Sequence, residues 1–225
     1  MKKCLLILCV TVFIVSCRNT DKSAQEDIVD EKKIGELKEN DTLSLQRVPE
    51  GLNAWMNFFR DEDKDFTIGH FKASGVSLHF GDLPDAIELK DPKSFEPYFI
   101  FSPDSTRYLD LFSYDHFIDN GKMIEGEADQ QVVLADRISK SRKQLLFSGP
   151  SQSIDFADWT GKDSFILGIT NTGENGKTIE AQLMLFRITD STFTNFDLDH
   201  SVQLDSIVLS GQKFSDIYLN QLKKR

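Results

Sequence analysis

Four histidines and many carboxylates are the side chains with which this chain could carry out acid–base or metal chemistry. The histidines are His70, His79, His116 and His200. None of them falls in a zinc-ligand spacing such as H-E-x-x-H, which places two imidazoles on one helix face. His116 follows Asp115 directly, with Asp110 and Asp119 nearby. A carboxylate beside an imidazole can serve general acid–base catalysis, so this cluster is the best local candidate for such chemistry.

An acidic loop offers oxygen ligands of the kind that hard cations prefer. Asp61, Asp63 and Asp65 stand at alternate positions, as the first ligands of an EF-hand loop do. The sixth position of such a loop needs glycine and is Phe66 here, while the twelfth needs a bidentate glutamate and is Lys72. We therefore expect no metal and no cofactor, and a calcium-stabilised module stays as an alternative.

The sequence motifs of common enzymes are missing. Ser210-Gly211-Gln212-Lys213 has the bare S-x-x-K spacing of penicillin-recognising enzymes, but the S-D-N and K-T-G elements of that family do not occur. The chain contains no G-x-S-x-G, Walker or G-x-G-x-x-G motif. We therefore assign no catalytic residue from the sequence.

The N-terminus has the pattern of an export signal. Lys2 and Lys3 precede an apolar run from Cys4 to Val15, which is shorter than the roughly 20 residues of a membrane-spanning helix. A cationic start, a short apolar segment and a small residue before the cleavage point predict a secretory signal peptide over residues 1–16.

The end of this segment resembles the lipobox of bacterial lipoproteins. Ile14, Val15 and Ser16 precede Cys17, with isoleucine where leucine is usual. The resemblance implies that Cys17 is lipidated, becomes the N-terminus after cleavage, and holds the protein on a membrane through its lipid. Arg18 follows in place of the aspartate that retains family members at the inner membrane, which implies the outer membrane of the cell envelope, on its periplasmic or surface face. An ordinary secretory signal that happens to contain cysteine is the alternative.

The composition excludes one class of partner. The formal net charge is −10 at pH 7. Nucleic-acid binding requires a basic footprint, so we expect no nucleic-acid partner. Of the three cysteines, Cys4 and Cys9 lie within the signal peptide, and Cys17 alone remains in the mature chain. No disulfide can then form, and stability must come from a hydrophobic core.

The remaining chain divides into a tether and one domain. Residues 17–45 are polar and acidic, and we interpret them as a flexible tether behind the lipidated cysteine. Residues 46–225 are predicted to form a single, mostly β domain. Leu52, Trp55, Met56 and Phe59 follow helical spacing and predict an amphipathic helix over 50–60. A C-terminal helix is predicted around Tyr218, with Ser215 as its cap.

Short strands are predicted along most of the domain. Residues 66–68 and 76–80 are expected to form the first two strands. Farther along, strands are expected at 98–102, 108–113, 131–136, 144–147, 154–159, 165–170, 182–187 and 193–196. Asp110 alternates with Tyr108 and Phe112, so we expect it to be buried and paired with Arg137 or Arg187.

The first turn of this series is Ser102-Pro103-Asp104-Ser105. It resembles the Ser-Pro-Asp strand-turn-strand unit of TolB-type propeller blades, with Ser105 where that family has glycine. The resemblance implies two blade-like units, about 97–149 and 150–200, which are too few for a closed propeller. We therefore predict a mainly β fold with a few short helices, in which two propeller-blade-like antiparallel meanders pack as a sandwich or a partial propeller.

The leading functional hypothesis is a lipid-anchored envelope protein that binds a protein or glycan partner without catalysis. An exposed aromatic patch that includes Trp55 or Trp159 would favour it. The alternative is an envelope or extracellular hydrolase with an Asp/His site, which predicts a cleft that gathers His116 and several aspartates.

Overall fold

The structure is a computed structural model that describes residues 43, 45, 47–78, 84–86, 92–126, 129–174, 176–204 and 214–224. All of these residues belong to one compact unit. The predicted signal peptide, Cys17, His79 and the S-x-x-K segment lie outside the described residues. None of the described helices combines the length and the apolar character needed to cross a membrane.

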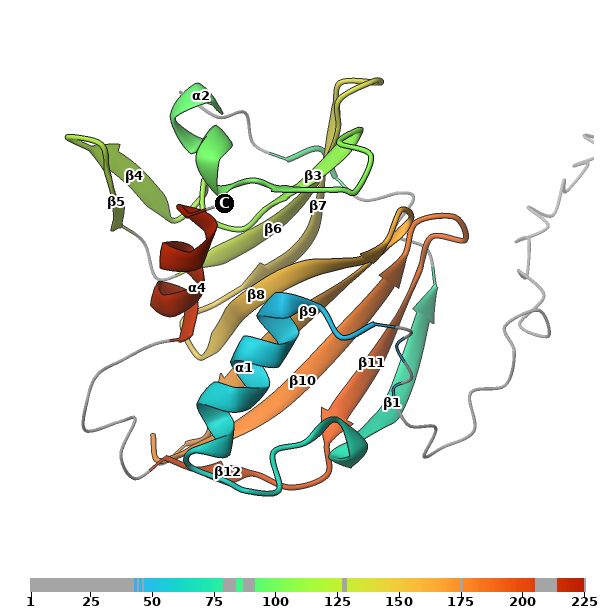
Figure 1. Cartoon of the computed structure of the whole chain (residues 1–225), viewed down its shortest axis with the longest axis vertical. Helices are drawn as coiled ribbons and strands as arrows, with labels where there is room; N and C mark the ends of the chain where they lie inside the picture. The colour runs from blue at the N-terminus through green and yellow to red at the C-terminus, as the bar shows by residue number, and fades with distance from the viewer. Residues whose placement is uncertain are drawn as a thin grey trace, which may run out of the picture. The chain divides into compact units, whose positions relative to one another are not determined.

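The larger sheet is antiparallel and six-stranded (Figure 1). Its members are β8 (Gln152–Gly161), β9 (Ser164–Thr172), β10 (Thr178–Arg187), β11 (Thr192–Leu198), β1 (Phe71–Leu78) and β12 (Val202–Gln203). Neighbouring strands follow the order β1-β11-β10-β9-β8, and β12 pairs with β10. The four consecutive strands β8 to β11 form the second predicted meander.

The smaller sheet has the order β2-β3-β6-β7. These strands are β2 (Ile100–Phe101), β3 (Arg107–Asp110), β6 (Gln130–Asp136) and β7 (Ser141–Ser148). A separate hairpin of β4 (His116–Asp119) and β5 (Lys122–Glu125) is inserted between β3 and β6. The prediction of a mainly β fold built from two antiparallel meanders, without a closed barrel, is therefore confirmed.

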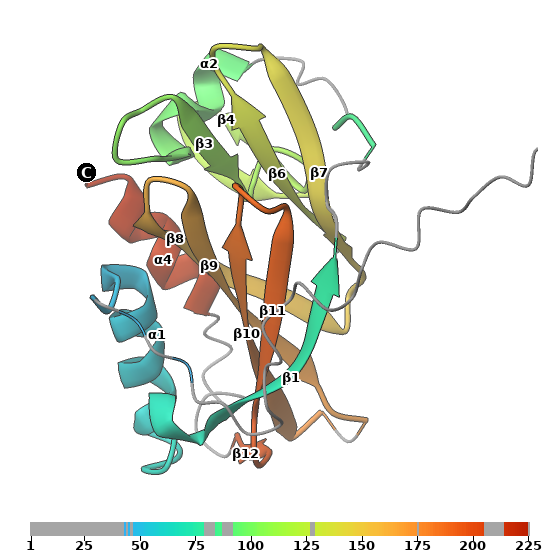
Figure 2. The same cartoon turned by 90° about the vertical axis from the view of Figure 1, so that its right-hand side faces the viewer.

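Two helices cover one face of the larger sheet. These are α1 (Glu50–Arg60) and α4 (Phe214–Leu222), and both pack against β8 (Figure 2). The amphipathic stripe predicted for residues 50–60 is the buried face of α1. Ser215 lies within the first turn of α4 and not before it, so the predicted cap is wrong. Among the described residues, the remaining short helices are η2 (Ile68–His70), α2 (Pro92–Phe95) and η3 (Glu96–Tyr98).

The strand predicted at residues 66–68 is also wrong. Phe66 is fully buried and packs edge-on against Trp55, with ring centroids 5.0 Å apart. The chain around it makes turn hydrogen bonds, from the Phe66 amide to the Asp63 carbonyl at 3.1 Å and from the His70 amide to the Thr67 carbonyl at 3.0 Å. Because these amides bond locally, they do not pair with a neighbouring strand, and the ladder of β1 begins at Phe71.

The turn between β2 and β3 keeps its shape through side-chain hydrogen bonds. Thr106 donates its amide and its hydroxyl to Asp104 Oδ1, at 3.1 and 2.7 Å, and Ser102 Oγ donates to the same oxygen at 2.8 Å. Ser105 takes φ = 56°, in the left-handed region that favours glycine. The position where blade turns carry glycine therefore has the backbone conformation of a glycine although it holds serine.

Asp110 is buried, as predicted, but its partner differs from the two that were expected. Arg142 Nη2 of β7 lies 3.0 Å from Asp110 Oδ2. Arg137 instead donates to the Ser105 carbonyl at 3.0 Å. Arg187 belongs to β10 of the larger sheet, whereas Arg142 of β7 reaches Asp110 of β3 across the strand β6 between them.

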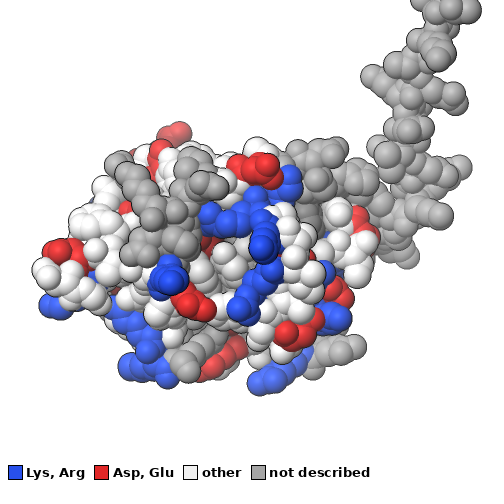
Figure 3. Space-filling model, turned by 90° about the horizontal axis from the view of Figure 1, so that it is seen from above, with Lys and Arg blue, Asp and Glu red and all other residues white. Residues whose placement is uncertain are grey.

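Polar side chains connect the two sheets. Trp159 Nε1 of β8 donates to the Ile100 carbonyl of β2 at 2.8 Å, and Arg107 Nη1 lies 2.7 Å from Asp163 Oδ1. On the face shown in Figure 3, several Lys and Arg side chains lie in a row near the centre, and Asp and Glu side chains lie around it.

Candidate functional site

A cavity of about 220 Å³ lies where α1, α4, the larger sheet and the β4–β5 hairpin meet. Its polar wall comes from Asp115, His116, Glu125, Gln130, Ser151, Gln152, Ser153, Asp155, Thr170, Thr172, Ser215 and Asp216. Its apolar wall comes from Phe58, Phe59, Phe112, Pro150, Ile179, Leu204, Phe214 and Leu219. Phenyl rings and hydrogen-bonding groups therefore line one partly open cavity.

An aspartate–histidine pair forms one side of the cavity. His116 Nδ1 lies 2.7 Å from Asp115 Oδ1, and the Asp115 residue is 3% exposed. The Phe112 ring meets the imidazole edge-on, with centroids 5.4 Å apart. Burial raises the pKa of the Asp115 carboxyl, and the hydrogen bond with His116 opposes that rise. The carboxylate orients the imidazole, as an acid–base pair requires.

Main-chain hydrogen bonds hold this pair in place. The His116 amide donates to the Phe112 carbonyl at 3.0 Å, and the Gly126 amide donates to the Asp115 carbonyl at 2.7 Å. The second bond closes the base of the β4–β5 hairpin, whose first residue is His116. The hairpin inserted in the first meander therefore positions His116, the one histidine among the described residues that line the cavity.

A second acid, Asp155, lies on the inner wall. It comes from β8, where the register with β9 shifts between Ile154 and Phe156. Such an irregularity re-aims a side chain, and the strand buries residues 154 to 158 without alternation. Asp155 is 3% exposed, and burial raises the pKa of its carboxyl to about 6.

Three donors surround the Asp155 carboxylate. Trp55 Nε1 donates to Oδ2 at 2.8 Å, Thr170 Oγ1 donates to Oδ2 at 3.1 Å, and Ser153 Oγ donates to Oδ1 at 2.7 Å. These bonds favour the ionised form and oppose the larger effect of burial on the pKa. The hydrogen bonds therefore fix the orientation of the carboxylate, while its burial still disfavours the ionised form.

No family model, no curated protein and no solved structure matches this chain. Its function must be argued from the site itself.

The predicted acid–base cluster is brought together only in part. Asp115 and His116 share the cavity, whereas Asp110 is paired with Arg142 and is not among the lining residues. Asp119 lies at the exposed end of β4, where Asn120 Nδ2 donates to it at 3.1 Å.

The two tryptophans form no exposed aromatic patch. Trp55 is fully buried, and Trp159 is half-buried with its indole nitrogen bonded to the main chain of β2. The exposed aromatic residues are Phe117, at 51%, and Phe147, at 46%, among the part of the chain that is described. Phe117 belongs to the same hairpin as His116, so exposed apolar surface adjoins one wall of the cavity.

The predicted calcium ligands do not converge. Asp63 Oδ1 accepts the Asp65 amide at 2.9 Å, and Asp63 Oδ2 lies 2.7 Å from His200 Nε2. Asp61 and Asp65 are exposed. Within the described ranges, the His, Cys, Asp and Glu side chains that gather as potential metal ligands are His70, Asp199 and His200.

Proposed function

We propose that this chain is a lipid-anchored envelope protein that binds a small glycan in the cavity beside α4. The observation that carries the proposal is the lining, in which carboxylates, amides and hydroxyls share a small space with four phenylalanine rings, those of Phe58, Phe59, Phe112 and Phe214. A sugar ring presents hydroxyl donors at its rim and C–H groups on its faces. Carboxylates accept hydrogen bonds from the sugar hydroxyls, and aromatic rings pack on the C–H faces.

The size and charge of the cavity narrow the ligand class. Its volume of about 220 Å³ lies below the roughly 300–1,000 Å³ of pockets for drug-sized ligands, which suits one sugar unit at the end of a glycan. Among the residues that the structure describes, four acids line it, Asp115, Glu125, Asp155 and Asp216, and no Lys or Arg does. Like charges repel across so short a distance, so neutral and amino sugars are favoured over phosphorylated, sulfated or acidic sugars.

Glycan binding can be tested with the purified full chain on an array of neutral, amino and acidic sugars, followed by calorimetric titration of the sugars retained. We expect a neutral or amino sugar to bind. Asp155→Asn and His116→Ala should each weaken that binding at least tenfold, because the first removes a carboxylate charge and the second an imidazole from the cavity lining. Asp119→Asn is the matched control, since this carboxylate is exposed outside the cavity.

Two results of this titration would contradict glycan binding in the cavity. Retention of no sugar at millimolar concentration, or equal affinity in the cavity variants and the control, would overturn the proposal. Preference for acidic sugars would contradict the charge argument.

A second candidate function is hydrolysis of a glycan at the same cavity. Asp115 and His116 form an oriented pair, and Asp155 with a pKa of about 6 lies in the same lining. Titratable groups poised near the working pH are suited to general acid–base catalysis. Release of reducing sugar from a bound glycan, lost in His116→Ala, would establish it, whereas unchanged recovery of the glycan would leave binding alone.

The membrane anchor has a separate test. A Cys17→Ser variant expressed in a bacterial host should lose all incorporation of labelled palmitate and appear in the soluble fraction. Thioether attachment requires the sulfur, which serine lacks. Cys9→Ser is the control and should be labelled like the unmodified chain. Labelling that persists in Cys17→Ser would refute the anchor.

A further inference from the structure

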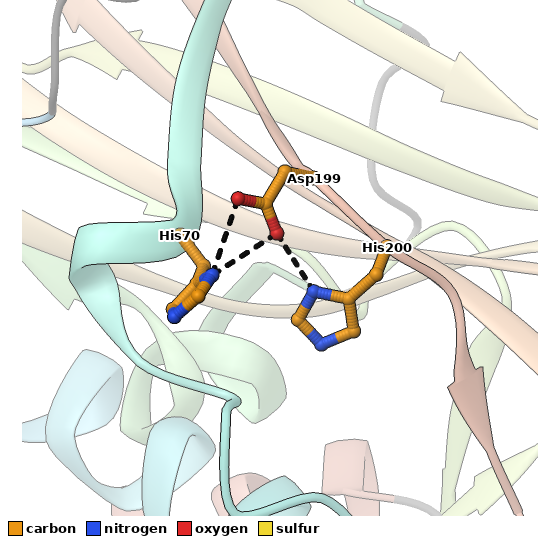
Figure 4. Close-up of side chains that lie close together, drawn as sticks. All are labelled: His70, Asp199 and His200. Atoms are coloured by element: carbon orange, nitrogen blue, oxygen red, sulfur yellow. Dashed lines mark hydrogen bonds and ion pairs between the residues drawn. The ribbon is translucent and has the colours of Figure 1, made fainter.

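Two histidines far apart in the chain meet at one carboxylate beyond the ends of β1 and β11 (Figure 4). His70 Nδ1 lies 3.1 Å from each oxygen of Asp199, and His200 Nδ1 lies 2.7 Å from Asp199 Oδ1. The two imidazoles meet edge-on, with centroids 5.6 Å apart. One ligand atom from each of the three residues lies within 4.8 Å of the others.

The fold fixes this meeting through the edge of the larger sheet. Phe71 and Leu198 are partners in the antiparallel ladder of β1 and β11, so His70 and Asp199 follow as the next pair. The Asp199 amide donates to the His70 carbonyl at 3.0 Å, which extends the ladder by one bond. His200 is adjacent in sequence. The three side chains are thus positioned by the main-chain ladder and by the hydrogen bonds between His70, His200 and Asp199.

A fourth residue orients one of the rings. His200 Nε2 lies 2.7 Å from Asp63 Oδ2, in the loop after α1. When Nε2 donates its proton to this carboxylate, Nδ1 becomes the ligand atom once a metal ion displaces the proton that it shares with Asp199 Oδ1. An outer carboxylate that fixes a ligating histidine in this way is a recurrent feature of zinc sites.

We propose that His70, Asp199 and His200 bind a divalent transition-metal ion, with Zn²⁺ as the best fit, and that Asp63 orients His200 from outside the coordination shell. Two imidazoles and one carboxylate are ligands that zinc accepts, and neither calcium nor magnesium favours nitrogen ligands.

The site retains room for a further ligand. Three protein ligands leave at least one position of a tetrahedral ion to water or to another small molecule. Asp199 and His200 also line a polar hollow of about 410 Å³ together with Glu180, Gln182 and Asp197. The open position is therefore accessible to solvent, as in zinc sites that act on a bound molecule and unlike closed structural sites.

Calorimetric titration of ZnCl2 into the purified, chelator-treated full chain tests this site. We expect one ion per chain with micromolar or tighter affinity. The double variant His70→Ala/His200→Ala should lose at least a hundredfold in affinity. Asp63→Asn keeps all three ligands and should weaken binding about 10- to 100-fold, the loss typical of an outer-shell partner.

Asp190→Asn serves as the control, because Asp190 is an exposed aspartate in the turn between β10 and β11. It should bind zinc like the unmodified chain. X-ray absorption at the zinc edge provides a test that needs no variant, and it should show two imidazole ligands with the remaining ligands oxygen. Absence of stoichiometric zinc, unchanged affinity in the double variant, or a zinc spectrum without imidazole would each overturn the proposal.

Discussion

Replacing Trp55 with alanine is expected to lower the free energy of unfolding by about 3–5 kcal/mol, the range found when large buried aromatic residues are truncated. Trp55 is fully buried at the centre of an aromatic cluster between α1 and the larger sheet. Its ring centroid lies 5.5 Å from that of Phe59, 5.0 Å from Phe66, 5.9 Å from Phe71 and 5.5 Å from Phe156. The truncation leaves a void that these rings cannot fill without moving.

The loss also has a polar part. Trp55 Nε1 donates to Asp155, and its removal leaves that buried carboxylate with two donors, from Ser153 and Thr170. Each carboxylate oxygen therefore keeps one donor, and the lost hydrogen bond itself contributes about 0.5–1.5 kcal/mol. Trp55→Phe separates the two parts, because it keeps most of the ring and removes the donor, and it should lie between the wild type and Trp55→Ala.

Urea unfolding followed by circular dichroism measures the change. Phe147→Ala is the matched control, since Phe147 is 46% exposed with its ring, among the described aromatic residues, against Tyr114 alone, so its truncation should lower stability much less than Trp55→Ala does. A loss below about 1 kcal/mol for Trp55→Ala would show that this cluster does not form the core of the domain.

Elements with a local signature could be predicted from the sequence. The stripe of Leu52, Trp55, Met56 and Phe59 has the period of a helix, and α1 has the bounds that this stripe predicted. The two meanders were also predictable, because each strand is a short apolar run followed by turn residues. Antiparallel pairing of consecutive strands then follows from short connections, without knowledge of any distant contact.

The chemically active groups could not be predicted in the same way. His70 bonds with Asp199 across 129 residues, a pairing decided by the register of β1 on β11 and not by spacing. Asp155 lies where β8 departs from regular pairing, so alternation gives no indication of which way its side chain points. Asp115 and His116 were identified because they are sequence neighbours, and their place in a cavity depends on an inserted hairpin.

Asp155→Asn is expected to make the protein more stable at neutral pH, by about 3 kcal/mol. Burial raises the pKa of Asp155 to about 6, above the value of about 3.9 for an unfolded aspartate. Between these two pKa values Asp155 is ionised in the unfolded chain but protonated in the folded protein, so ionisation favours unfolding. The contribution of Asp155 to stability is therefore fully present below about pH 4 and is lost as pH rises through about 6. Each pKa unit corresponds to about 1.4 kcal/mol, and about two units separate the states.

Asparagine can replace this acid without leaving a hydrogen bond unmade. Its carbonyl oxygen can accept from Trp55 and Thr170, which both bond to Oδ2, and its amide can donate to the hydroxyl of Ser153, which bonds to Oδ1. The variant therefore keeps the geometry and removes the charge. Its advantage over the wild type should vanish near pH 3.5 and reach its full size at pH 7–8.

Comparison of the wild type with Asp155→Asn by urea unfolding across this pH range isolates the effect of the Asp155 carboxyl. Asp104, Asp136 and Asp199 have lowered pKa values, so they lose stabilisation as pH falls, but they contribute equally to both proteins and cancel in the difference. A flat difference between pH 4 and 8 would show that Asp155 titrates normally. If stability rises in Asp155→Asn while sugar binding falls, the buried charge is retained for the cavity and not for the fold, which is the trade-off expected of a functional acid.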